Sequence, residues 1–100
     1  MKNFRTYQLA IKFYHSTQEI NLSGCLRNQL DRAASSIVLN LAEGYGRSTR
    51  KDQKRFFDIA LGSLRECQAV LEITVPDNQS AKIFAEKLAA HIFCLIKALS

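Results

Sequence analysis

The sequence predicts an all-α protein, an antiparallel up-down-up-down four-helix bundle. Apolar residues recur every three or four positions along four long stretches, which is the period of an amphipathic helix. No stretch alternates apolar and polar residues for long enough to predict a strand. The sequence has only four glycines and one proline, a scarcity that favours long uninterrupted helices. One hundred residues are enough for one domain, so we expect a single bundle over residues 1–100.

The first two helices are expected at about residues 4–17 and 23–44. Asn3 is a suitable N-cap for the first helix. Gly44 and Gly46 are expected to end the second, because glycine takes positive φ without strain. The expected apolar stripes are Phe4, Tyr7, Ala10, Ile11 and Tyr14 in the first helix, and Leu26, Leu30, Ala33, Ile37 and Leu41 in the second.

The last two helices are expected at about residues 49–74 and 78–99. Thr49 begins a variant of the capping box, and the single proline favours a helix end shortly before it. Asp77 or Asn78 is expected to cap the fourth helix. The expected stripes are Ala60, Leu64, Cys67 and Leu71 beside Phe56, Phe57 and Val70 in the third helix, and Ala81, Phe84, Ala85, Leu88, Ile92, Leu95, Ile96 and Leu99 in the fourth.

A polar stripe follows another side of the second helix and continues to Arg47. Its arginine, serine, asparagine and glutamate side chains recur at steps of three and four, which suits a ladder of hydrogen bonds. Two interpretations stay open: the stripe locks the second helix to the third, or it lines a subunit interface. The residues expected in this network are Gln29, Arg32, Ser36, Asn40, Glu43, Ser63 and Glu66.

Basic residues gather around the start of the third helix. Between positions 47 and 55 they outnumber the single acidic residue and give a local charge of +4, in a chain whose net charge is +5. The cluster is either an ordinary solvated helix start or a site for an anion, since a helix start also offers free N–H groups. Tyr45 is close enough in sequence to stack on a base. The residues expected to contact phosphate are Arg47, Arg50, Lys51, Lys54 and Arg55.

The sequence contains no recognisable catalytic motif and no metal-ligand spacing. His15 and His91 belong to no catalytic arrangement, and Glu43 and Glu66 are better explained as partners of arginine or serine. We therefore expect no enzyme activity, no metal and no cofactor. Three widely spaced cysteines suit the reducing cytoplasm, and no apolar run approaches the ~20 residues of a membrane span.

The fourth helix has a wider apolar arc than one bundle seam needs. Ile83, Ala90, Phe93 and Cys94 lie off its main stripe. Burial against another copy of the chain or against a partner protein is one explanation, and we prefer self-association. Scattered surface hydrophobic residues, which are normal on monomers, are the other.

Two blocks of the sequence resemble a known family. The pattern Q-L-x-R-A-x-x-S-I-x-x-N-x-A-E-G-x-x-R is matched by Gln29, Leu30, Arg32, Ala33, Ser36, Ile37, Asn40, Ala42, Glu43, Gly44 and Arg47. The pattern F-x-x-x-A-x-G-S-x-x-E is matched by Phe56, Ala60, Gly62, Ser63 and Glu66. With these blocks, the chain resembles the 23S ribosomal RNA intervening sequence protein family over essentially its whole length. The family often has proline where this chain has Val38 and Leu39, so we expect a straight second helix here.

The resemblance implies a small bacterial protein, a left-handed antiparallel four-helix bundle that forms a homopentamer. It implies no known enzyme activity. A related group of similar fold assists reverse transcriptases through a basic surface, which makes RNA or DNA binding the leading functional expectation. The expected partners are therefore further copies of the chain, RNA or DNA, and a reverse transcriptase or other protein. The alternative is a protein–protein interaction module with no nucleic-acid role.

Overall fold

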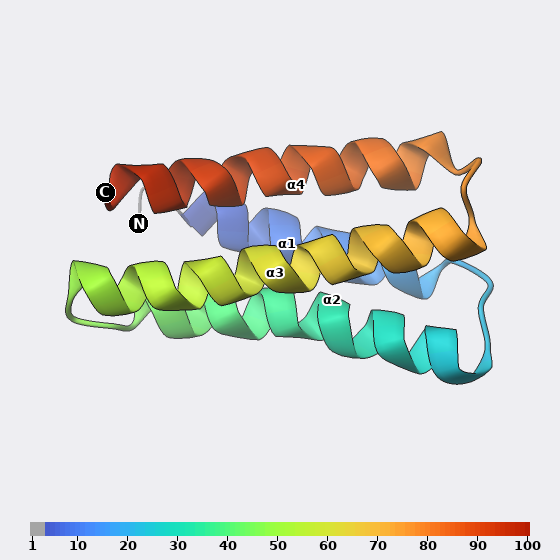
Figure 1. Ribbon diagram of the computed structural model, residues 1–100, viewed down its shortest axis with the longest axis horizontal. Coiled ribbons are helices and arrows are strands. Elements are labelled where there is room, and N and C mark those ends of the chain that lie inside the picture. The colour runs from blue at the N-terminus through green and yellow to red at the C-terminus, as the bar shows by residue number, and fades with distance from the viewer. Residues whose placement is uncertain (1–3) are drawn as a thin grey trace.

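All four predicted helices are present. The computed structural model describes residues 4–100, in which α1 spans Phe4–Gln18, α2 Gly24–Tyr45, α3 Arg50–Thr74 and α4 Gln79–Ala98 (Figure 1). The described part of the chain contains no strand. Among the same residues, no helix is long and apolar enough to cross a lipid bilayer. The all-α prediction is therefore confirmed.

The helices lie side by side along one long axis. The α1–α2 and α3–α4 links lie at one end of the molecule, and the α2–α3 link lies at the other (Figure 1). Each helix packs on the next, α1 also packs on α4, and the contact between α2 and α3 is the most extensive. Within the described residues no Cα atom of α2 lies within 8 Å of a Cα atom of α4, so these two helices occupy diagonal corners of the bundle and meet only through core side chains.

Local capping interactions start two of the helices. The Thr49 hydroxyl accepts a hydrogen bond from the Asp52 N–H at 3.1 Å, as the capping-box pattern predicts. The Asn78 side chain accepts from the Ala81 N–H at 3.0 Å and caps α4. The predicted Asn3 cap lies outside the described residues.

The end of α2 does not use a left-handed glycine, and this prediction was wrong. Gly46 has φ −85°, and its N–H bonds to the carbonyl oxygens of Ala42 and Glu43. The helix instead ends in a 3₁₀-type turn, in which each N–H bonds to the carbonyl oxygen three residues earlier, as the Arg47 N–H does to the Gly44 oxygen at 3.2 Å. Gly44 has a packing role instead, since it is buried where α2 meets the aromatic side chains at the start of α3.

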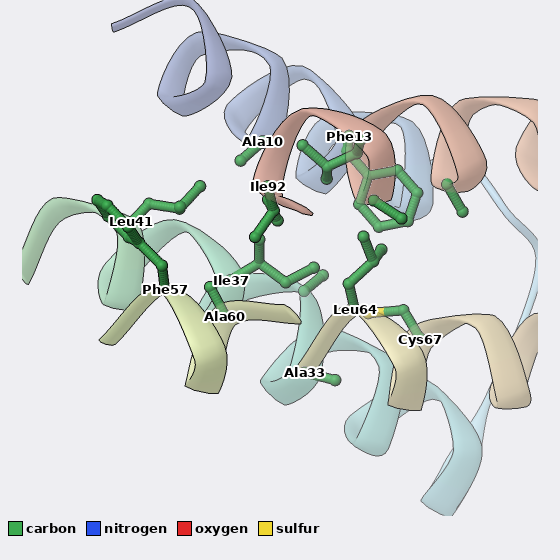
Figure 2. Packing of buried hydrophobic residues seen from close by; sticks show 14 of the residues in the cluster. Ala10, Phe13, Ala33, Ile37, Leu41, Phe57, Ala60, Leu64, Cys67 and Ile92 are labelled. Carbon is green, nitrogen blue, oxygen red and sulfur yellow. The ribbon is translucent and has the colours of Figure 1, made fainter. Parts of the chain in front are cut away.

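The core is a single cluster along the middle of the bundle. Ile37, Leu64, Ile92 and Phe13 point toward one another from four different helices (Figure 2). The Phe13 ring meets the Phe84 ring edge to face, with 5.4 Å between their centroids. The central positions of the predicted stripes of α2, α3 and α4 are buried: Leu30, Ala33, Ile37, Leu41, Ala60, Leu64, Cys67, Leu71, Ala85, Leu88, Ile92, Leu95 and Ile96.

The apolar stripe predicted for α1 was displaced. Phe13 is buried although it was left out, whereas Phe4 is 40% exposed and three other predicted members are only partly buried. Two threonines also face the core. Burial of Thr17 is tolerated because its hydroxyl donates a hydrogen bond to the Tyr14 carbonyl oxygen in the preceding turn and needs no partner in the core. The face that turns inward is Thr6, Ala10, Phe13 and Thr17.

We expect the two glycines Gly44, in the last turn of α2, and Gly62, in the middle of α3, to respond oppositely to alanine. A Cβ on Gly44 would lie 2.5 Å from Cε1 of the buried Phe57 ring, so Gly44→Ala should lower the free energy of unfolding by about 1–3 kcal/mol. A Cβ on Gly62 meets nothing within 4 Å, so Gly62→Ala should raise it by about 0.5–1 kcal/mol. Urea unfolding followed by circular dichroism measures both, and a Gly44→Ala protein as stable as the parent would contradict the close approach.

Candidate functional site

A seam of polar side chains joins α2 to α3. The Ser36 and Ser63 hydroxyls are 2.8 Å apart, and the Asn40 amide donates to the Ser36 carbonyl oxygen at 2.9 Å and to the Ser36 hydroxyl at 3.0 Å. One turn or more away, the Gln29 amide donates to the Glu66 carboxylate at 3.2 Å. We call these five residues the polar seam. It links the two helices that pack together most extensively.

Two residues of the predicted network lie outside this seam. Glu43 accepts from the Arg47 guanidinium at 2.6 Å within the last turn of α2 and the link beyond it. The side chain of Arg32 makes no hydrogen bond or ion pair with another described residue. The structure therefore divides the predicted ladder into a helix-to-helix seam, a local ion pair and one unpartnered cation.

A shallow groove of about 720 Å³ runs over the polar seam. Cys25 and Leu39, both exposed on α2, contribute to its wall, and Leu39 leaves 66% of its surface exposed. The rest of the groove is lined mainly by the seam and by Arg32. This surface is thus polar in the middle and apolar at one place, a mixture that resembles a protein interface more than a small-molecule pocket.

The predicted phosphate-contacting residues lie around the α2–α3 link and the start of α3, and we call them the basic cluster. Arg50 donates to the Ala98 carbonyl oxygen at 2.9 Å, at the negative end of α4. Lys54 pairs with Asp58 at 3.1 Å, and Arg55 lies 3.6 Å from Asp52. Lys51 has no ion pair or side-chain hydrogen bond to another described residue.

The cluster is therefore less charged in space than in sequence. Its five cations lie beside three carboxylates, those of Glu43, Asp52 and Asp58, which leaves a local excess of +2. These ion pairs are exposed, so each contributes little to stability and can exchange for another anion.

The aromatic ring of Phe56 lies against two arginines of the basic cluster. The guanidinium carbons of Arg47 and Arg55 lie 4.6 and 4.4 Å from the centre of its ring, within cation–π distance. Sequence reasoning placed Phe56 beside the core and missed this contact. The arginine immediately before it, at position 55, was the available signal.

Tyr45 does not extend the basic cluster, because its ring is packed against other aromatic rings. Its ring packs edge to face on Phe57, with 5.3 Å between centroids, and lies 6.3 Å from that of Phe4. Burial raises the pKa of its hydroxyl, and a hydrogen bond with Thr6 opposes that rise. The expectation that Tyr45 stacks on a base does not fit this packed position.

Cys67 acts as a core residue. Burial, and then the negative charge of Glu66, raise the pKa of its thiol to about 12, so it stays protonated at neutral pH. Cys25 and Cys94 are exposed. Among the described residues, no group of three or more histidine, cysteine or acidic side chains lies close enough together to hold a metal ion.

We expect the two serines of the polar seam to be energetically coupled. Ser36→Ala and Ser63→Ala should each lower the free energy of unfolding by about 1 kcal/mol, because each leaves a half-buried hydroxyl without its partner. The double variant should cost less than the sum of the two, by about 0.5 kcal/mol or more. A urea double-mutant cycle measures this, with the exposed Ser80→Ala as control. Strict additivity would show that the pair does not couple the helices.

Comparison with known proteins identifies a family for this chain. No curated protein matches the chain significantly. The model of the family described as 23S rRNA-intervening sequence protein matches residues 2–100, which include all four helices, the polar seam and the basic cluster. The chain therefore belongs to the 23S rRNA-intervening sequence protein family.

Proposed function

We propose that the chain is a non-enzymatic, oligomeric four-helix bundle protein that binds RNA or DNA, or assists an enzyme that acts on nucleic acid. The basic cluster carries this proposal. It places an unpaired Lys51 and the exchangeable cations Lys54 and Arg55 at the first turns of a helix. The family description, which names ribosomal RNA, agrees with a nucleic-acid context.

Phosphate is the group that this surface suits best. Cations on flexible side chains can exchange an exposed carboxylate for a phosphate, and the start of α3 adds unsatisfied backbone N–H groups. The sequence has no base-reading motif, so the proposed contacts are to the backbone and not to particular bases. Binding of this kind weakens steeply as salt rises.

The proposal includes the finer features that the family resemblance implies. The bundle is antiparallel and left-handed, the assembly is a cytoplasmic homopentamer in a bacterium, and a reverse transcriptase or another nucleic-acid enzyme is a candidate partner. The basic cluster of one copy, with its excess charge of +2, produces only a weak electrostatic field. Repetition of the cluster around such an assembly would strengthen this field.

A protein–protein interaction module with no nucleic-acid role is the second candidate. The outer face of α4 favours it, because Ile83 and Phe93 leave 61% and 51% of their surfaces exposed. If Ile83→Ser with Phe93→Ser abolishes capture of a protein partner while RNA binding is unchanged, this candidate is favoured over the first.

We expect filter-binding titrations at several salt concentrations to show affinity for RNA or DNA that falls as salt rises. Lys51→Ala should weaken binding and reduce the slope of log K against log salt by about 0.7–0.9 for each phosphate that is no longer neutralised. Lys12→Ala is the matched control, because Lys12 is an exposed lysine on α1 away from the cluster. An affinity that does not change with salt, or equal effects of the two variants, would contradict the proposal.

A further inference from the structure

The outer surface of α4 carries three exposed residues in a line. Glu86, Phe93 and Lys97 are separated by seven and four positions, so they lie within about 40° of one another around the helix. The Lys97 ammonium is 5.9 Å from the centre of the Phe93 ring. The Glu86 carboxylate has no hydrogen bond or ion pair within the described part of the chain. We call this line the α4 stripe.

The outer surface of α2 carries a matching line. Arg32, Leu39 and Glu43 are also separated by seven and four positions and are all exposed. Arg32 is the unpartnered cation beside the groove, and Leu39 is part of the groove's apolar wall and leaves 66% of its surface exposed. Glu43 accepts from Arg47 through one carboxylate oxygen, Oε2. We call this line the α2 stripe.

The two stripes are complementary at every position when the helices run in the same direction. Glu86 then meets Arg32, Phe93 meets Leu39, and Lys97 meets Glu43. The rise of a helix spaces the three contacts at about 10 and 6 Å on both sides, so one alignment brings all three together. Aligned in the opposite direction with the apolar pair in contact, the spacings of seven and four no longer coincide. The match therefore specifies both the surfaces and their relative direction.

The two stripes cannot meet within one molecule. α2 and α4 occupy diagonal corners of the bundle, and both stripes lie on exposed surfaces that face away from the core. Both helices run from the end that holds the α1–α2 and α3–α4 links toward the other end (Figure 1). If α4 of one copy lies along α2 of the next in the same direction, the two bundles stand side by side with their long axes roughly parallel. Each copy still has one stripe free for a further neighbour, as in a heterologous contact.

We infer that the α4 stripe of one copy docks on the α2 stripe of a second copy, with Glu86 on Arg32, Phe93 on Leu39 and Lys97 on Glu43. This inference rests on the oligomeric part of the proposed function and gives it a surface and a direction. Charge complementarity identifies the partner as a second copy of the chain. The α4 stripe has the order acidic, apolar, basic, and the α2 stripe of the same chain has the complementary order basic, apolar, acidic. The apolar pair supplies burial, and the two flanking charge pairs fix the register.

Exchange of the charges of one flanking pair, Arg32 and Glu86, tests the contact. Arg32→Glu places a glutamate against Glu86, and Glu86→Arg places an arginine against Arg32. Each should weaken self-association about ten-fold or more, because like charges then face each other. The double variant, Arg32→Glu with Glu86→Arg, should recover most of the loss. Mass is measured by sedimentation velocity over a range of protein concentrations, and circular dichroism checks that each variant is folded.

A matched control changes the same charges elsewhere. Lys12→Glu with Glu19→Arg alters two exposed residues at α1 and just after it, and should leave the mass unchanged. Failure of the double variant to recover association, or an unchanged mass in both single variants, would overturn the inference. So would a parent chain that is monomeric at all concentrations. Salt-dependent binding of RNA by Lys51 and its neighbours is measured separately, so its loss would count against the nucleic-acid proposal and not against this contact.

Cross-linking gives a second, independent test. In a Cys25→Ser and Cys94→Ser background, Leu39→Cys with Phe93→Cys should give a ladder of covalent oligomers under oxidised glutathione, while either single cysteine variant should not. Cross-linking of a single variant with itself would show a symmetric contact and overturn the proposed arrangement. Absence of any ladder from the folded, associated double variant would do the same.

Discussion

The close packing of α2 against α3 is the constraint on which the rest of the structure depends. At one end, the absence of a side chain on Gly44 lets the Phe57 ring lie against the backbone of α2. Further along, Ser36 and Ser63 are short enough for their hydroxyls to meet at 2.8 Å. A larger residue at any of these positions would separate the helices. The contact is therefore set by the small residues Gly44, Ser36 and Ser63, and the large residues behind them fill the core.

This packing also fixes the surface around the α2–α3 link. With Phe57 held against Gly44 and the Tyr45 ring, its neighbour Phe56 is left half-exposed, where it receives the guanidinium groups of Arg47 and Arg55. Arg50 is tied to the last turn of α4 through the Ala98 carbonyl. The basic cluster is thus partly ordered in the unbound chain, which would lower the conformational entropy lost in the proposed binding of a phosphate.

The parts of the structure that the sequence predicts well are those that depend on local spacing. The spacing of apolar residues predicted the helices, and local sequence predicted the Thr49 and Asn78 caps. These predictions succeed because the interacting residues lie within about one helical turn of each other. The prediction of the inward face of α1 was wrong because aromatic residues occur on several sides of that helix, and periodicity does not decide which of them a neighbouring helix covers. The exchange of roles between Tyr45 and Phe56 has a similar cause, since it depends on the angle at which the link joins α2 to α3.

The candidate site divides in the same way. The pairing of Glu43 with Arg47 four positions later could be expected from the helix alone, whereas the bonds from Gln29 to Glu66 and from Ser36 to Ser63 require the register between two helices. The sequence could not show that Arg32 is left over, because that depends on where every acid on α3 lies. An exposed arginine without an ion pair adds little to the stability of one copy, and the proposed contact between copies gives it a partner.

The direction of the helices connects the two proposals. α2 ends and α3 begins at the same end of the bundle, so the basic cluster lies at one end of the long axis (Figure 1). In the proposed contact neighbouring bundles stand parallel, and every copy presents its cluster at the same end of the assembly. A local excess of +2 in one chain would be a weak site alone, but several such sites on one face of the proposed assembly would act together on one strand of nucleic acid. An antiparallel contact would place the clusters at alternate ends and would lose this effect, so the direction of the contact matters as much to the proposed function as its existence.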